Sequence, residues 1–137
     1  MDNFMRTEFI SKTANEGYAR AAVAIFLAQL DPTVEQLAEI KTAVSEAVTN
    51  AIVHGYEGMS GMVILTCQWT GHLVTVTVED KGCGISDVEM ARTPLFTTKP
   101  ELERSGMGFT VMENFMDSVE VYSKEHSGTK VVMIKKL

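Results

Sequence analysis

Two β-branched runs with a short turn between them constrain the fold of this 137-residue chain more than any other feature. Residues 61–69, GMVILTCQW, and 72–80, HLVTVTVED, are each long enough for one strand, and Thr70-Gly71 joins them. In the second run three valines alternate with Leu and Thr, which is the period of a strand with one face on a core. The sequence therefore predicts a β-hairpin in an antiparallel sheet that needs a covering layer.

Two segments before the hairpin are predicted to form helices for that layer. Asn15 is predicted to cap a helix over residues 16–30, which Asp31-Pro32 ends. Thr33 and Gln36 form a T-x-x-Q capping box, which predicts the start of a second, longer helix. Apolar residues recur in that helix about every 3.6 positions until Gly55.

The remaining segments complete a β-α-α-β-β-α-lid-α-β-β order. A first strand is expected over residues 4–12, and Ser86 with Glu89 forms a second capping-box pattern before a short helix. Residues 92–104 hold two prolines without a clear period, which predicts a mobile lid. The other predicted elements are a helix over 109–116 and strands over 118–123 and 129–135, turned at Ser127-Gly128. We expect one α/β domain over residues 1–137, a two-layer sandwich.

Charge and composition exclude several classes of function. The formal charge is −6, with 18 acidic and 12 basic residues, which argues against direct nucleic-acid binding. No apolar run approaches the roughly 20 residues that cross a bilayer, and MDNFMRTEF lacks the pattern of a signal peptide. We therefore expect a cytoplasmic protein that does not bind membranes. Cys67 and Cys83 lack C-x-x-C spacing and are expected to be free thiols.

Three short patterns carry residues suited to chemistry. In Asp80-x-Gly82-x-Gly84, the Asp at a strand end could accept a hydrogen bond from a ligand amino group while the glycines make room, although a plain Asp-Gly turn has the same pattern. In Ser105-Gly106-x-Gly108, glycines before a helix expose N–H groups that favour phosphate. Arg104 and Lys99, just upstream, could add cationic contacts or be solvated loop charges.

Glu46 and Asn50 lie four residues apart on one face of the second helix. An Asn amide oxygen is a neutral hard ligand for Mg²⁺, which takes phosphate oxygens and waters at its other positions. A Glu one turn earlier could act as a general base near the terminal phosphate. The alternative is an exposed Glu with an Asn that faces solvent.

Together these patterns resemble the Bergerat (GHKL) ATP-binding fold of gyrase B, Hsp90, histidine kinases and MutL. Glu46-x-x-x-Asn50 resembles its N box, Asp80-x-Gly82-x-Gly84 its G1 box and Gly106-x-Gly108 its G2 box. The resemblance implies a mixed, mostly antiparallel sheet covered by helices on one face, with an ATP lid. It also implies binding of ATP or ADP with Mg²⁺.

Residues 45–56, SEAVTNAIVHGY, and 94–117, PLFTTKPELERSGMGFTVMENFMD, are similar to the bacterial anti-sigma serine kinases, and specifically to the sporulation anti-sigma F factors. Members of that family are homodimers. The resemblance implies that the chain silences a sigma factor, sigma F, in an ATP-bound state. It also implies phosphorylation of a serine on the anti-anti-sigma partner SpoIIAA, which makes the chain an ATP-dependent protein serine/threonine kinase in transcription regulation.

The resemblance implies a role for each matching residue. Asn50 would hold Mg²⁺ and Glu46 would take the proton of the partner's serine. Asp80 would accept a hydrogen bond from the adenine amino group, in a pocket shaped by Gly82 and Gly84 and supported by Thr129. The phosphate cradle would consist of Arg104, Ser105, Gly106 and Gly108. Arg20, on the first helix away from the three boxes, would contact a protein partner or be a solvated charge, and His54 is interpreted as a helix-end His.

Two other interpretations stay open. One is a nucleotide-gated sigma-binding module that phosphorylates nothing, which the boxes alone do not distinguish from a kinase. The other is a detached histidine-kinase catalytic domain, disfavoured because the first predicted strand begins within a few residues of Met1 and leaves no room for phosphoacceptor helices.

Overall fold

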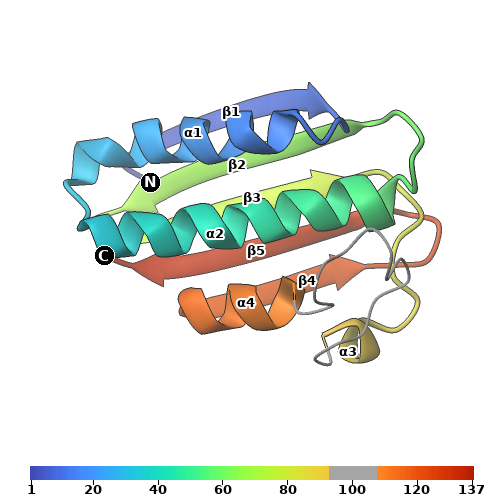
Figure 1. Cartoon of the computed structure of the whole chain (residues 1–137). Helices are drawn as coiled ribbons and strands as arrows, with labels where there is room; N and C mark the ends of the chain where they lie inside the picture. The colour runs from blue at the N-terminus through green and yellow to red at the C-terminus, as the bar shows by residue number, and fades with distance from the viewer. Residues whose placement is uncertain (93–107) are drawn as a thin grey trace.

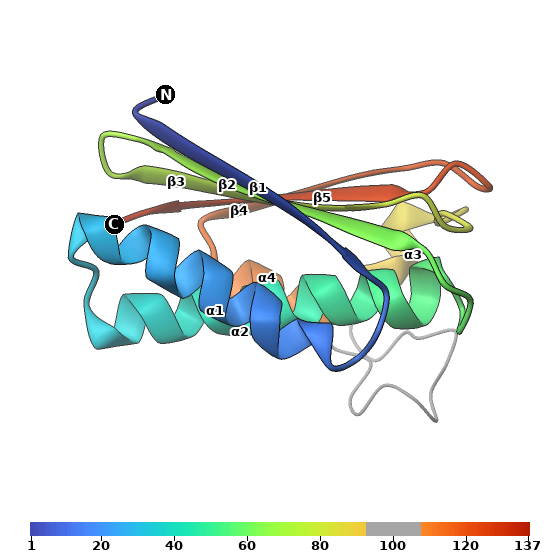
Figure 2. The same cartoon turned by 90° about the horizontal axis from the view of Figure 1, so that it is seen from above.

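The computed structural model describes residues 1–92 and 108–137, which form a sheet with helices on one of its faces (Figures 1 and 2). The strands are β1 (Asn3–Ile10), β2 (Met62–Thr70), β3 (Leu73–Asp80), β4 (Ser118–Ser123) and β5 (Thr129–Lys136). The helices are α1 (Asn15–Leu27), α2 (Val34–Asn50), α3 (Val88–Ala91) and α4 (Gly108–Phe115). A short 3₁₀ turn, η1 (Ala28–Leu30), follows α1, and a π-helical turn, η2 (Ala51–Gly55), continues α2. The two-layer α/β prediction is confirmed.

The sheet has the order β1-β2-β3-β5-β4, and all four pairings are antiparallel. The predicted β2–β3 hairpin is confirmed, and β4 and β5 form a second one. Because β3 and β5 are antiparallel neighbours, the end of β3 meets the start of β5. In this register Asp80 is paired with Thr129. Two residues far apart in the sequence are thus neighbours at one end of the sheet.

The core lies between the sheet and the helices α1, α2 and α4 (Figure 2). Alternate residues of the central strands face it, as the period-2 pattern predicted: Val74, Val76 and Val78 are at most 2% exposed. The intervening residues Thr75 and Thr77 lie on the face without helices. On the helical side the buried residues include Val23, Leu27, Ile40, Val44 and Val48. Among the described residues, no helix combines the length and apolarity that a membrane span requires.

The ends of the helices test the predicted caps. At α2 the capping box is present: the Thr33 hydroxyl accepts the Gln36 N–H at 3.0 Å, and the Gln36 side chain accepts the Thr33 N–H at 2.9 Å. The cap predicted at Asn15 is wrong, because its side-chain amide donates instead to the Ile10 carbonyl at 2.8 Å. The cap predicted at Ser86 is also displaced by one residue. Asp87 occupies that position and accepts the Met90 N–H at 3.0 Å.

The second helix ends at Gly55 as predicted, but its last turn is π-helical. The Tyr56 N–H reaches back to the Ala51 carbonyl at 3.1 Å, which is the i→i+5 bond of a widened turn. This turn lies directly against the end of β3. A Cβ atom at Gly55 would be only 2.8 Å from the Asp80 carboxyl group, so only glycine fits there.

Candidate functional site

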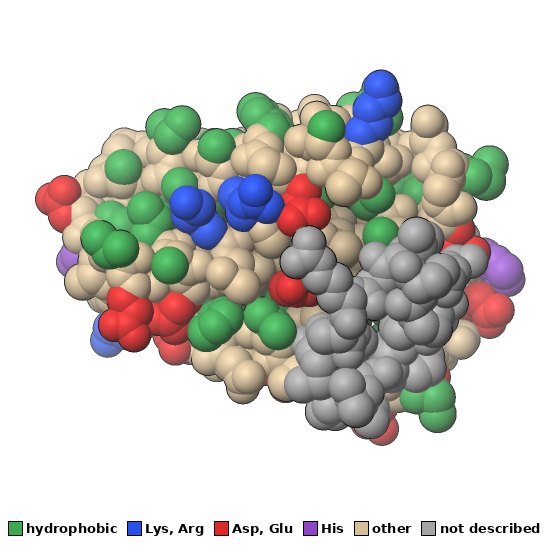
Figure 3. All heavy atoms as spheres, viewed as in Figure 1, with side chains coloured by type: hydrophobic (Ala, Val, Ile, Leu, Met, Phe, Trp, Pro, Cys, Tyr) green, Lys and Arg blue, Asp and Glu red, His purple; other side chains and the backbone are tan. Residues whose placement is uncertain are grey.

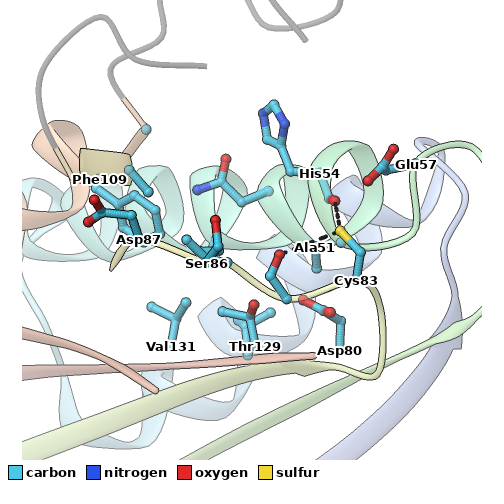
Figure 4. Close-up of a pocket in the computed structure, with 18 of the residues that line it drawn as sticks. Ala51, His54, Glu57, Asp80, Cys83, Ser86, Asp87, Phe109, Thr129 and Val131 are labelled. Atoms are coloured by element: carbon cyan, nitrogen blue, oxygen red, sulfur yellow. Dashed lines mark hydrogen bonds between the residues drawn. The ribbon is translucent and has the colours of Figure 1, made fainter. Parts of the chain in front are cut away.

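A pocket of about 280 Å³ opens where the end of α2 lies over the ends of β3 and β5. Its walls come from α2, η2, β3 and the segment after it, α3, α4 and β5 (Figure 4). Five of the predicted site residues line it: Asn50, Asp80, Gly84, Gly108 and Thr129. Three others, Arg104, Ser105 and Gly106, lie outside the described residues, as do Lys99 and all of the predicted lid except Arg92.

Asp80 is the buried acceptor of this pocket, with only 4% of its surface exposed. Its Oδ1 accepts the Gly82 N–H at 2.9 Å, and the Thr129 N–H also donates to its carboxyl group. Figure 4 shows Asp80 and Thr129 side by side on the floor of the pocket. Burial raises the pKa of Asp80 to about 6, because desolvation disfavours the charged form more than these hydrogen bonds favour it. At neutral pH the pocket therefore holds a charged acceptor.

The glycines around Asp80 allow backbone segments to approach each other. A Cβ atom at Gly82 would lie 1.9 Å from the Gly55 carbonyl oxygen. At Gly84 it would lie 2.0 Å from the Lys124 carbonyl oxygen, and the φ of +75° also favours glycine. The two glycines therefore lie in different places relative to the pocket. Gly84 lines the pocket, whereas Gly82 lies outside its lining and lets the loop pack on the end of α2.

Apolar side chains form most of the remaining wall. Val78 and Val131 come from the sheet, Ala51 from η2, and Ile85 and Phe109 from the segments that close the pocket. Apolar walls with a buried carboxylate at one end suit a ligand with flat apolar faces and a hydrogen-bond donor on one edge. An adenine ring with its amino group has these properties.

Asn50 lines the pocket from α2, and Glu46 lies one helical turn earlier on the same helix, half-buried but outside the lining residues. Among residues 1–92 and 108–137 no group of three or more His, Cys, Asp and Glu side chains is placed to hold a metal ion. The Asn50 amide oxygen does fit Mg²⁺, because this ion is commonly held by one or two protein oxygens together with substrate phosphates and waters.

A polar cluster fixes the orientation of α2 next to Glu46 and Asn50. Arg20 of α1 donates to Glu16 Oε1 and to Ser45 Oγ, both at 2.9 Å. Thr49 Oγ1 donates to Glu16 Oε2 at 2.8 Å. Ser45 and Thr49 immediately precede the two predicted site residues, so Arg20 is closer to the N box than its place in the sequence suggested. The only sequence signal for this cluster was the i,i+4 spacing of Glu16 and Arg20.

The helical face around this cluster has a mixed character. Figure 3 shows that its Lys and Arg side chains are few and stand among hydrophobic and acidic ones. The Arg20 side chain is 39% exposed although it forms an ion pair with Glu16. Part of the Arg20 side chain is therefore accessible although its guanidinium bonds to both α1 and α2.

Three residues that were not predicted for the site lie in the pocket or directly behind it. His54 lines the pocket from η2, close to Cys83 (Figure 4). The Cys83 thiol donates to the His54 carbonyl at 3.1 Å, and burial together with Glu57 raises its pKa to about 11. This thiol is thus a weak nucleophile at neutral pH. Ser123, at the end of β4, bonds to Ile85 and Thr129 of the pocket. No sequence pattern indicated it, because the contact depends on strand register.

Comparisons with known proteins identify the family and the fold. The family model described as histidine kinase-like ATPase domain matches residues 9–135. An anti-sigma F factor of Clostridium perfringens strain 13 is 62% identical over all of this chain and 99% of its own. An anti-sigma F factor of Anoxybacillus flavithermus is 60% identical over all of this chain and 94% of its own.

Two solved structures share the fold. The RsbU and RsbW domains of Rv1364c from Mycobacterium tuberculosis match with a TM-score of 0.71 and 20% identity, over 98% of this chain and 32% of that one. This chain therefore spans about a third of that protein. The catalytic domain of histidine kinase ThkA matches with a TM-score of 0.57 and 19% identity, over 96% of this chain and 95% of that one.

Proposed function

We propose a function from one premise: the chain belongs to the histidine kinase-like ATPase domain family and, within it, to the anti-sigma F factors. The chain binds ATP with Mg²⁺ in the pocket between α2 and the sheet. In the ATP-bound state it binds and inhibits the sporulation sigma factor sigma F. It also transfers a phosphoryl group to a serine of an anti-anti-sigma partner of the SpoIIAA type, and it acts as a homodimer.

The observation that carries this proposal is the buried Asp80 carboxylate at the end of an apolar pocket that also holds Asn50. The carboxylate accepts a hydrogen bond from the adenine amino group, and the apolar walls contact the ring. Gly108, at the start of α4, also lines this pocket, and helix N–H groups at such a position favour phosphate. In this proposal Arg104, Ser105 and Gly106 complete the phosphate cradle.

The chemistry of transfer depends mostly on position and charge. Asn50 holds Mg²⁺, which when bound neutralises charge on the phosphates. Glu46, one turn along α2, accepts the proton of the partner's serine hydroxyl. The hydrogen bonds of Arg20 and Glu16 to α2 hold these two side chains in orientation. The exposed part of Arg20 contacts the protein partner.

Incubation with γ-labelled ATP, Mg²⁺ and purified anti-anti-sigma protein tests the proposal. We expect label on a partner serine with the wild-type chain. Glu46→Gln should abolish transfer and retain ATP binding, whereas Asn50→Ala should lose Mg²⁺-dependent nucleotide binding. Glu35→Gln is the matched control, because Glu35 is an exposed carboxylate in the first turn of the same helix. This variant should transfer the phosphoryl group at the wild-type rate.

The base assignment, the kinase activity and the homodimer each have a contradicting result. Full transfer by Glu46→Gln would exclude Glu46 as the base. A partner that binds in the presence of ATP but never acquires label would favour the nucleotide-gated binding module without kinase activity. Sedimentation of the chain as a monomer at micromolar concentration would exclude the homodimer.

A further inference from the structure

A serine hydroxyl behind the pocket makes three short hydrogen-bond contacts. Ser123 Oγ lies 2.7 Å from the Ile85 backbone nitrogen, 2.9 Å from the Gly128 carbonyl oxygen and 2.8 Å from Thr129 Oγ1. These contacts join the loop after β3, the β4–β5 turn and the pocket floor. Ser123 itself is not among the residues that line the pocket.

The number of protons available decides the direction of these bonds. A serine hydroxyl has one proton and two lone pairs. The Ile85 N–H can only donate and the Gly128 carbonyl can only accept, so the Ser123 proton goes to Gly128. The contact between Ser123 Oγ and Thr129 Oγ1 is then a hydrogen bond only if Thr129 donates its proton to Ser123. In the reverse arrangement, the Ser123 oxygen would face the Gly128 carbonyl at 2.9 Å without a proton between them.

Thr129 therefore has no proton left for a ligand. Its hydroxyl oxygen lines the pocket beside Asp80 and presents only lone pairs (Figure 4). Above its pKa, the Asp80 carboxylate also only accepts, and two backbone N–H groups already occupy part of its capacity. The floor of the pocket thus presents two adjacent acceptors and no side-chain donor.

We infer that Ser123 is a specificity-determining residue: by taking the Thr129 proton, it makes the pocket floor accept hydrogen bonds only and selects purines with a 6-amino group over purines with a 6-oxo group. This inference rests on the proposed nucleotide site. A 6-amino group has two N–H donors for the two acceptors. A 6-oxo purine places oxygen lone pairs at this edge and has one N–H donor there, at N1, so at least one of the two acceptors stays unpaired, which weakens binding.

The test is the ratio of the dissociation constants for ATP and ITP with Mg²⁺, measured by titration calorimetry on the full chain. ITP differs from ATP at this edge of the base alone, where a 6-oxo group and an N1–H replace the 6-amino group and the unprotonated N1, so the ratio isolates this edge. In Ser123→Ala, Thr129 regains a free proton to donate. We expect the preference for ATP over ITP to narrow about tenfold, which is the value of one hydrogen bond gained or lost.

Three further variants separate the effect of the Ser123 and Thr129 hydrogen bonds on nucleotide selection from a general disturbance of the fold. Ser123→Thr keeps the hydroxyl and should retain the wild-type ratio. Thr129→Val should weaken ATP binding about tenfold without weakening ITP binding, because it removes an acceptor and supplies no donor. Ser118→Ala, at the other end of β4, is the matched control and should change neither constant.

The outcomes distinguish this inference from the proposed function. A wild-type chain that binds neither nucleotide overturns both. A wild-type chain that prefers ATP, together with an unchanged ratio in Ser123→Ala, overturns the inference alone. If Ser123→Ala does not fold, Thr129→Val decides the matter: selective loss of ATP supports the inference, and equal loss of ATP and ITP overturns it.

Discussion

Replacement of Asp80 by Asn should stabilise the nucleotide-free chain while it weakens ATP binding. Burial raises the pKa of this carboxyl group from 3.8 to about 6. Each pKa unit corresponds to about 1.4 kcal/mol, so ionised Asp80 costs the folded state about 3 kcal/mol at neutral pH. Asn removes that charge, and its amide oxygen can still accept the Gly82 N–H. One lost acceptor costs about 1 kcal/mol, which leaves a net gain of about 2 kcal/mol.

The sign of the pH dependence follows from the direction of the shift. The folded chain binds the Asp80 proton more tightly than the unfolded chain, so this group lowers stability as pH rises from about 4 to about 6. In Asp80→Asn this contribution is absent. The stability advantage of the variant should therefore be full at pH 7.5. At pH 5, where the wild-type folded state is largely protonated, it should be reduced by about 1.4 kcal/mol.

Thermal unfolding followed by circular dichroism at the two pH values measures this difference. For a chain of this length we expect Asp80→Asn to unfold about 6 °C above wild type at pH 7.5 and about 2 °C above it at pH 5. Added Mg-ATP should raise the unfolding temperature of the wild type only. Asp31→Asn is the matched control, because Asp31 is exposed and Asn tolerates its positive φ of 49°. A variant less stable than wild type at pH 7.5, or a difference independent of pH, would refute the reasoning.

Two further predictions concern the segments that support the site. Gly82→Ala should lower the free energy of unfolding by at least about 2 kcal/mol and weaken ATP binding, since its Cβ would lie 1.9 Å from the Gly55 carbonyl oxygen. The control is Gly17→Ala in α1, whose Cβ would meet nothing closer than 3.7 Å and which should be stabilising by up to about 1 kcal/mol. Urea denaturation measures both variants, and equal free energies of unfolding for the two would contradict the prediction. Thr33→Ala should cost about 1 kcal/mol through loss of the capping box and leave the ATP dissociation constant unchanged. A changed dissociation constant would mean that the start of α2 is coupled to the pocket.

Most of the elements could be predicted from the sequence because their signals are local. The alternation of Val74, Val76 and Val78 defined which face of β3 is buried, and Thr33 with Gln36 defined the start of α2. The two wrong caps show the limit of local patterns. Asn15 and Ser86 are residue types that often cap helices. The Asn15 amide bonds instead to the Ile10 carbonyl, and Asp87, an equally suitable cap, takes the position after Ser86.

The candidate site could be predicted only in part. Asn50, Asp80, Gly84, Gly108 and Thr129 all line one pocket, as three short patterns and a family resemblance had suggested. The close approach of Gly82 to the Gly55 carbonyl oxygen could not be predicted, because that carbonyl belongs to η2, far away in the sequence.

The sequence by itself determined the hydrophobic period of each segment, the start of α2 and the identity of the polar residues at the segment ends. Only the tertiary structure decided the β3–β5 register that puts Asp80 beside Thr129, the burial that raises the pKa of Asp80, and the hydrogen bond between Thr129 and Ser123. The physical reason is the distance along the chain between the groups that interact. Periodicity and capping depend on residues within one or two turns, whereas register, desolvation and proton direction depend on groups that only the packed sheet and helices bring together.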